Sequence, residues 1–257
     1  MGCLPPPFHG RSEPPAPAWD REGILDKGTE IRYNEMMGGG EVVTKYKYRI
    51  VKEGYPFIGT MLAVAVLAGY VAGPVFAVAP AVLMVYFIYF FRNRVLDVKQ
   101  DPDILYSPAD GTVMGVEEFF DKEFLNEPAK KVTIFLSVFN VHTNRSPMTG
   151  LIKYMRYTCG GYEPAFKDSA PVVNERMAIG LDNGTNRILV IQIAGILARR
   201  IVSWTSLGSR LKQGECYGMI KFGSCTELVV PRSVEIMVRK GDKVQGGISI
   251  IGRQRAE

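Results

Sequence analysis

Residues 56–91 form one uncharged apolar run, and no other stretch of the chain restricts the fold as strongly. A helix needs about 20 apolar residues to cross the hydrocarbon core of a bilayer. The run is too long for one comfortable crossing and slightly short for two. Gly73-Pro74 and Ala79-Pro80 lie near its middle, where a turn would fall. The sequence therefore predicts a helical hairpin that is fully or partly inserted in a membrane, and the alternative is a hairpin buried inside a globular core.

Basic residues flank this run on both sides and set its expected orientation. They are Lys47, Arg49 and Lys52 before the run, and Arg92 and Arg94 after it. Because positive charge is retained on the cytoplasmic side of a membrane, both ends of the hairpin are expected in the cytoplasm. Residues 46–96 are thus the predicted anchoring segment, and the expected location is the cytoplasmic side of the cell membrane.

Outside this segment, composition excludes several classes of function. Residues 1–45 begin with a proline-rich stretch and are expected to be a disordered or linker-like extension. The net charge of +5 comes without a dense Lys/Arg block, so nucleic-acid binding is not expected, although an anionic membrane surface would suit it. The four cysteines lack paired spacing, and His142 is the single histidine outside the proline-rich tail, so no metal site is expected.

From residue 97 onward, short β-branched runs alternate with turn signals. Strands are predicted at 111–114, 132–136, 187–193 and 234–238, with turns at 108–111, 182–184 and 240–243. This spacing indicates a largely antiparallel β domain over residues 97–257, with short helices only at 162–169 and 196–204. The strand, turn, Gly-Gly and strand pattern of the tail is typical of a biotinyl/lipoyl-like hammerhead element. The expected fold class is mostly β (α+β), preceded by an N-terminal hydrophobic helical hairpin.

Three stretches place polar side chains in apolar or turn contexts. Asp110 lies in the turn SPADGTV, His142 closes a strand-like run, and Ser224 follows Gly223 in the stretch KFGSC. A carboxylate, an imidazole and a hydroxyl are the groups that activate a serine. Spacing alone does not show that they meet, and each has a structural alternative: a turn aspartate, a hydrogen-bonded histidine, and a bulge or tight turn at Gly223-Ser224.

The surroundings of Ser224 disfavour a hydrolase and favour self-cleavage. The G-x-S-x-G elbow needs glycines two residues on either side of the serine, where this chain has Phe222 and Thr226. A serine after glycine can instead attack the carbonyl of Gly223, because glycine leaves the approach open and tolerates strain. The resulting ester can eliminate the upstream carboxylate to leave dehydroalanine. Hydrolysis then gives a pyruvoyl group, an electron sink like pyridoxal phosphate.

The chain resembles the short, prokaryotic type of phosphatidylserine decarboxylase proenzyme. The motifs that carry the resemblance are SPADGTV, FLSVFNVHTNRSP, NERMAIGL, QIAGILARRIVSW, GMIKFGSCTELVVP and the KGDKVQGG tail. The similarity extends from the apolar segment to about residue 252. The chain departs from the family in its proline-rich extension, at Arg92-Asn93-Arg94, where Arg-Asp-Pro is common, and at Cys225, which is expected to be a packed strand residue.

The resemblance implies a self-cleaving, pyruvoyl-dependent decarboxylase that converts phosphatidylserine to phosphatidylethanolamine and CO₂. Cleavage would give a β chain ending at Gly223 and an α chain, residues 224–257, starting with a pyruvoyl group made from Ser224. His142 would take the serine proton and later protonate the carbanion, while Asp110 would fix the tautomer of His142. The two chains would form a heterodimer, with a dimer of these expected from the resemblance only.

Other assignments stay open at the level of sequence. Arg145, Arg199 and Arg200 are candidate contacts for the substrate phosphate by charge, with solvated surface arginine as the alternative. A membrane-anchored serine hydrolase could use Ser224, His142 and Asp110. A non-enzymatic membrane adaptor with a hammerhead-type β module would use none of them. Both rivals predict an intact chain, and the hydrolase also predicts labelling of Ser224 by a fluorophosphonate.

Overall fold

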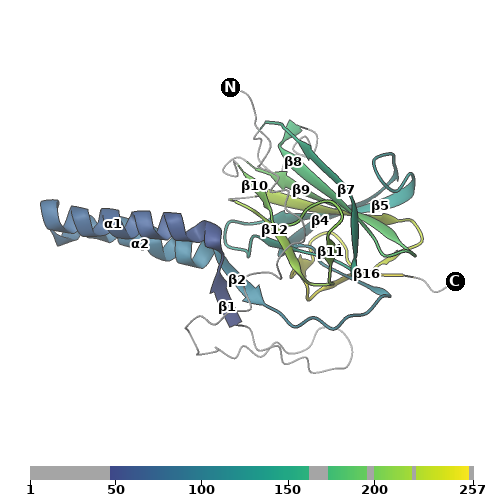
Figure 1. Ribbon diagram of the computed structural model, residues 1–257, viewed down its shortest axis with the longest axis horizontal. Coiled ribbons are helices and arrows are strands. Elements are labelled where there is room, and N and C mark those ends of the chain that lie inside the picture. Colours follow the sequence, from purple (N-terminus) through teal and green to yellow (C-terminus); the bar gives the residue numbers. More distant parts are fainter. Residues whose placement is uncertain (1–46, 162–172, 196–199, 222–223, 255–257) are drawn as a thin grey trace.

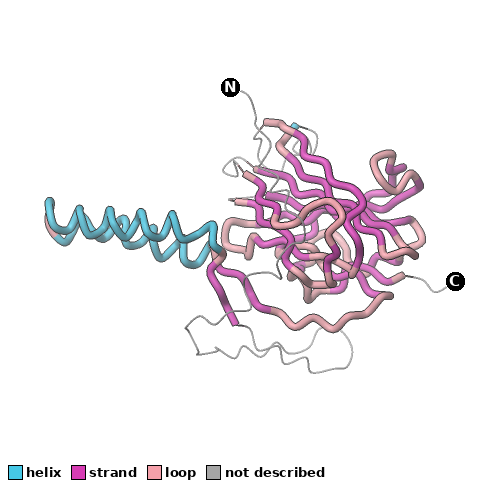
Figure 2. Tube along the Cα trace, in the orientation of Figure 1, coloured by secondary structure: helices cyan, strands magenta, loops and turns pink. Residues whose placement is uncertain are grey.

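In the computed structural model, residues 47–161, 173–195, 200–221 and 224–254 are described. A pair of hydrophobic helices projects from a domain built of strands (Figure 1). Figure 2 shows the same division, with the long helices on one side and the strands making up the body. The prediction of a mostly β chain with an N-terminal helical hairpin is therefore confirmed. The predicted extension over residues 1–45 lies outside the described residues.

The hairpin consists of α1 (Tyr55–Ala72) and α2 (Pro74–Phe90). Each helix begins with a proline in its first turn, where the missing backbone N–H has no intrahelical partner to lose. Gly73 joins the helices with a φ of 102°, a conformation that glycine adopts without the usual steric cost. The turn thus falls at the first of the two predicted breaks, and Pro80 lies inside α2.

The surface of the hairpin is apolar and uncovered. Residues Lys52–Ala72 form a helical stretch with a mean hydropathy of 1.7, long and apolar enough to cross a membrane, and none of its apolar window is buried. Side chains such as Tyr70 and Val75 are 89% and 77% exposed. The alternative of a hairpin buried in a globular core is therefore wrong. At 1.5 Å per residue each helix is about 26 Å long, close to the hydrocarbon thickness of a bilayer.

The base of the hairpin is fixed to the β domain by features that the sequence did not predict. Strands β1 (Lys47–Ile50) and β2 (Arg92–Val95) form an antiparallel ladder just outside the helix ends. Between β1 and α1, the short 3₁₀ helix η1 (Lys52–Gly54) packs so closely that a Cβ at Gly54 would lie 2.6 Å from that of Phe91. Phe90, Phe91 and Met219 are fully buried together, which joins the hairpin to the strand that carries Met219.

The largest sheet of the described chain has eight strands, all antiparallel to their neighbours. In sheet order they are β11 (Arg210–Leu211), β7 (Gly150–Thr158), β8 (Arg176–Asp182), β9 (Arg187–Ala194), β13 (Ser224–Pro231), β5 (Glu127–Leu136), β4 (Gly111–Asp121) and β15 (Lys243–Val244). Two three-stranded sheets accompany it. They are β10 (Ile201–Ser203), β12 (Cys216–Ile220) and β6 (Thr143–Arg145), and β14 (Glu235–Ile236), β16 (Ile250–Arg253) and β3 (Ile104–Tyr106).

Strand β13 lies at the centre of the large sheet and is buried along its whole length. Alternate side chains of a strand point to opposite faces. Leu228 and Val230 accordingly belong to the main hydrophobic core, whereas Cys225 and Val229 belong to a second cluster. Both faces of the strand are therefore buried, and the burial includes three polar residues, Ser224, Thr226 and Glu227.

Most predicted strands are present, with different lengths. The predicted strands at 111–114, 132–136 and 187–193 lie within β4, β5 and β9, but only Glu235–Ile236 of the stretch 234–238 is a strand. The predicted helix over 196–204 is wrong for Ile201–Ser203, which forms β10 and pairs with β12. Its β-branched residues fit a pleated surface once a partner strand is available. Residues 196–199 and the predicted helix at 162–169 lie outside the described residues.

Candidate active site

Ser224 is the first residue of β13 and is fully buried. It pairs regularly with Leu136 of β5 and Ala194 of β9, whereas Phe222 and Gly223 lie outside the described residues. Its hydroxyl oxygen has no hydrogen-bond partner within the described chain. An unsatisfied buried polar group costs about 1–3 kcal/mol, so a native fold that retains one calls for an explanation, of which chemistry is one.

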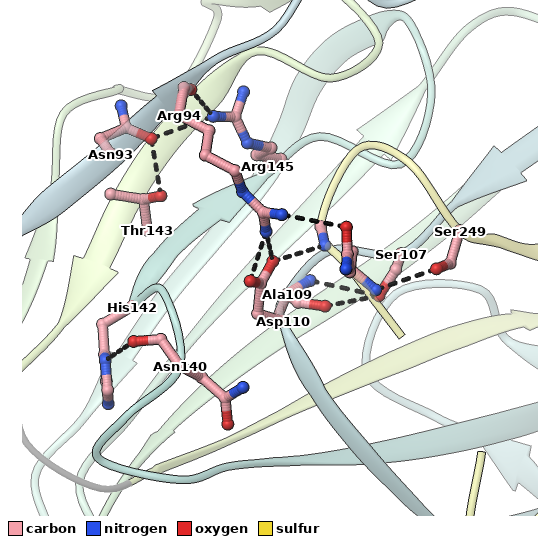
Figure 3. A network of polar contacts seen from close by, with 12 residues as sticks. Asn93, Arg94, Ser107, Ala109, Asp110, Asn140, His142, Thr143, Arg145 and Ser249 are labelled. Carbon is pink, nitrogen blue, oxygen red and sulfur yellow. Dashed lines mark hydrogen bonds and ion pairs between the residues drawn. The ribbon is translucent and has the colours of Figure 1, made fainter. Parts of the chain in front are cut away.

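His142 lies between β5 and β6, and its imidazole is fully buried. Its Nδ1 lies 2.9 Å from the carbonyl oxygen of Asn140 (Figure 3). Because a carbonyl only accepts, Nδ1 carries the proton and donates it, which leaves a bare lone pair on Nε2 of the neutral ring. That Nε2 is buried and has no partner in the described part of the structure.

The charge state of His142 follows from its surroundings. Burial lowers its pKa to about 4, and Arg92 acts in the same direction, while the Asn140 carbonyl opposes both. The ring is therefore neutral at pH 7. A neutral imidazole with one fixed N–H and one unpartnered lone pair can act as a general base.

Two contacts bring His142 and Ser224 into the same region. The N–H of Ile220 donates to the carbonyl of His142 at 3.2 Å, and the Asn144 amide donates to Thr226 Oγ1 at 2.8 Å. Ser224 lies between Ile220 and Thr226 in the chain, and two residues of extended chain span about 7 Å. Ser224 therefore lies near β6, the strand that begins directly after His142.

Asp110 is buried in an ion pair with Arg94 and makes no hydrogen bond to His142 among the described contacts. Arg94 binds both carboxylate oxygens, and the N–H of Gly246 donates to Oδ1 at 2.8 Å. Burial raises the pKa of the Asp110 carboxyl, although Arg94 and the Gly246 N–H oppose this. Figure 3 shows the aspartate in the arginine network and the histidine bonded to Asn140 alone. The predicted contact that fixes the tautomer is therefore made by a backbone carbonyl.

Arg145 is committed to the fold and does not face solvent. It is 5% exposed and donates to the carbonyl of Gly214 at 2.8 Å, to Asn93 Oδ1 at 2.9 Å and to the carbonyl of Arg94. The alternative of a solvated surface arginine is thus wrong, and the guanidinium of Arg145 is already hydrogen bonded within the fold. Sequence reasoning missed the roles of Asn93 and Arg94, although both lie where the chain departs from the Arg-Asp-Pro pattern. Arg199 lies outside the described residues.

The end of the hairpin packs directly on the candidate base. The rings of Phe90 and His142 lie 4.3 Å apart between centroids. The hydroxyl of Tyr89 and the guanidinium of Arg92 both donate to the carbonyl of Phe139, at 3.1 and 2.9 Å. The loop that leads to His142 is therefore held by Tyr89, in the last turn of α2, and by Arg92, the first residue of β2.

The remaining predicted features are simpler. Cys225 is 1% exposed in β13, which confirms it as a packed strand residue, and burial raises the pKa of its thiol to about 12. Such a thiol stays protonated and is a poor nucleophile. Within the ranges that the structure describes, no group of three or more His, Cys, Asp or Glu side chains could hold a metal ion.

The chain is similar to one protein family and to several curated proteins. A family model described as phosphatidylserine decarboxylase matches residues 83–252, a range that contains Asp110, His142 and Ser224. Similar curated proteins carry the name phosphatidylserine decarboxylase proenzyme. The one from Symbiobacterium thermophilum is 44% identical over 79% of this chain and 95% of its own length. Those from Carboxydothermus hydrogenoformans and Syntrophus aciditrophicus are 47% and 39% identical, over 66% and 81% of this chain and 81% and 99% of their own.

Proposed function

The chain belongs to the phosphatidylserine decarboxylase proenzyme family, and on that basis we propose how its buried Ser224 and His142 generate the active enzyme. The protein is an enzyme that converts phosphatidylserine to phosphatidylethanolamine and CO₂. The name proenzyme implies that the chain processes itself. The serine hydrolase and the non-enzymatic adaptor are not supported by these similarities.

The proposal rests on two buried polar atoms that lie in one region and have no hydrogen-bond partner in the described chain. They are Nε2 of His142 and the hydroxyl oxygen of Ser224. In the first step Nε2 accepts the hydroxyl proton, and Oγ attacks the carbonyl carbon of Gly223. The peptide C–N bond breaks, and an ester joins the two segments. Removal of the Cα proton of Ser224 then expels the Gly223 carboxylate. Water replaces the nitrogen at residue 224, ammonia leaves, and the α chain begins with a ketone.

The buried position of Ser224 suits the group that this reaction would leave. A pyruvoyl group at residue 224 would act as the electron sink for the loss of CO₂. The walls around it are apolar strands, which exclude water and strengthen electrostatic interactions. His142, neutral and with its tautomer fixed by Asn140, is the residue placed to return a proton to the α-carbon of the substrate.

We assign Asp110 a positioning role in this scheme. Its ion pair with Arg94 holds the turn that contains Pro108. The Pro108 carbonyl in turn accepts the backbone N–H of Arg145 at 2.9 Å and the side-chain amide of Asn144 at 3.4 Å. Asp110 therefore supports β6, the strand that follows the candidate base.

The hairpin would bring this site to its lipid. Its uncovered apolar helices and basic flanks favour insertion with both ends on the cytoplasmic side. The substrate headgroup lies at the bilayer surface, so an anchored domain need not extract the lipid.

The test compares the intact masses of the wild-type protein and Ser224→Ala. The wild type is expected as two chains, with residues 224–257 lacking an N-terminal amine, and the variant as one uncut chain. A wild-type chain that remains whole, and whose Ser224 reacts with a fluorophosphonate, would instead establish the hydrolase.

A further inference from the structure

Lys221 occupies a position at the base of the hairpin, close to both reacting residues. It directly follows β12, whose last residue, Ile220, is hydrogen bonded to the carbonyl of His142. Ser224 lies three residues further on. The N–H of Lys221 donates to the carbonyl of Arg200 at 3.3 Å, so the two cationic residues are neighbours. Lys221 is half-buried and Arg200 is exposed.

Lys221 has no ion-pair partner within the described chain. Its Nζ lies 5.6 Å from the ring centroid of Phe57, and no ion pair or hydrogen bond of this amine occurs within the described ranges. Glu53 is the carboxylate that acts on it, but Glu53 accepts the indole N–H of Trp204 at 2.8 Å and forms no ion pair with Lys221. Burial lowers the pKa of Lys221, and the neighbouring charge of Arg200 lowers it further, whereas Glu53 raises it.

Two neighbouring cations beside one carboxylate leave an excess of one positive charge. A bound monoanion would balance that charge and relieve the repulsion between Lys221 and Arg200. The ammonium of Lys221 also lies over the Phe57 ring, and this cation–π contact favours its place at the base of the hairpin.

Depth in the membrane identifies the anion. Phe57 lies in the first turn of α1, where the apolar hairpin starts and the headgroup region of an inserted bilayer would lie. A phospholipid presents a phosphodiester monoanion at this level. In phosphatidylserine only the ester oxygen and one methylene carbon separate that phosphate from the α-carbon that must reach residue 224.

We propose that Lys221, with Arg200 beside it, binds the phosphodiester of the lipid headgroup and so contributes to the affinity for the substrate. The proposal rests on the decarboxylase function proposed above. Neither Arg145 nor a metal is needed for this recognition, because the two side chains at the hairpin base supply the positive charge.

The first experiment uses full-length enzyme that has cleaved itself, with a short-chain phosphatidylserine that stays monomeric in solution. Lys221→Gln is expected to raise KM about 10- to 100-fold with kcat nearly unchanged, because a charge-assisted contact to the substrate is lost. Arg200→Gln should have a smaller effect, and Lys221→Arg should restore most of the affinity. Lys122→Gln, which removes the same charge in the exposed turn between β4 and β5, should leave KM unchanged.

A second measurement does not depend on turnover. Binding of the same lipid to uncut Ser224→Ala protein is measured by calorimetry, and adding Lys221→Gln should weaken it by a similar factor. Because neither protein cleaves itself, the result does not depend on whether Lys221→Gln impairs cleavage. If the variant loses activity only on anionic vesicles and binds monomeric lipid normally, Lys221 serves general membrane attraction and the proposal is wrong. Inorganic phosphate binding as tightly as the lipid would likewise overturn it. A wild-type protein without decarboxylase activity would instead refute the proposed function.

Discussion

At the scale of single residues, the site depends on what surrounds each polar atom more than on which residues are present. The sequence supplies Asp110, His142 and Ser224 as a set, and the set alone suggests that the carboxylate orients the imidazole. In the structure the Asn140 carbonyl does so, and Asp110 is bound by Arg94. No sequence pattern could predict that a carbonyl replaces the carboxylate as the partner of His142, because this depends on the direction of one backbone carbonyl.

The buried neutral histidine makes a prediction about pH. Its folded-state pKa of about 4 lies below the ordinary value of 6.5, so between these values the unfolded chain binds a proton that the folded chain does not. Stability is therefore full above pH 6.5 and falls as the pH drops toward 4, by about 2 kcal/mol between pH 7 and pH 5. Urea unfolding of uncut Ser224→Ala protein at both pH values measures this. Adding His142→Asn should remove that share of the pH dependence, and an unchanged dependence would show that His142 titrates normally.

The ion pair of Arg94 with Asp110 makes a second prediction at this scale. Arg94→Met leaves a buried carboxylate without its partner, which should lower the free energy of unfolding by about 3–5 kcal/mol. Adding Asp110→Asn removes the stranded charge and should recover part of the loss. Thermal or urea unfolding of the two single variants and the double variant, all in Ser224→Ala protein, gives the coupling energy. Strict additivity would mean that the two residues do not interact.

At the scale of elements, the hairpin could be predicted and its attachment could not. An uncharged run with Gly-Pro breaks specifies two helices by local rules, and the structure has them. The ladder of β1 with β2 and the contact of Phe90 with His142 join segments far apart in the chain, so no local pattern reveals them. The same reason explains Ile201–Ser203, where pairing with β12 decides the conformation over the local helical signal.

The contact between hairpin and base predicts a role for Phe90 in cleavage. Phe90→Ala should cost about 3–5 kcal/mol of stability, because it empties a fully buried site, and it should slow self-cleavage by releasing the His142 ring. Phe76→Ala is the matched control, since Phe76 lies on the same helix but is 63% exposed. Cleavage is followed by intact mass over time in detergent micelles. Equal rates for the two variants would show that the hairpin is an anchor without influence on the site.

At the scale of the whole molecule, the position of the cut decides how the product holds together. Cleavage before Ser224 would make β13 the first element of the α chain, and β13 pairs along its length with β5 and with most of β9. The strand is buried throughout, so it cannot leave without opening the core. The cut enzyme should therefore elute as one species in size-exclusion chromatography and separate into two chains only in denaturant. Elution of a free α chain in native buffer would contradict this.

Because β13 lies at the centre of the sheet, the protein is expected to refold before cleavage but not after it. Before cleavage the strand inserts between its neighbours as part of one chain, with a high effective concentration set by the connection to β12. After cleavage the same insertion is an association of two separate molecules, one of them a short peptide with an exposed apolar strand. A proenzyme that unfolds can return to its native state, whereas a mature enzyme that unfolds loses its active group with the departing peptide. The lifetime of the mature enzyme is thus governed by the rate of its first unfolding event.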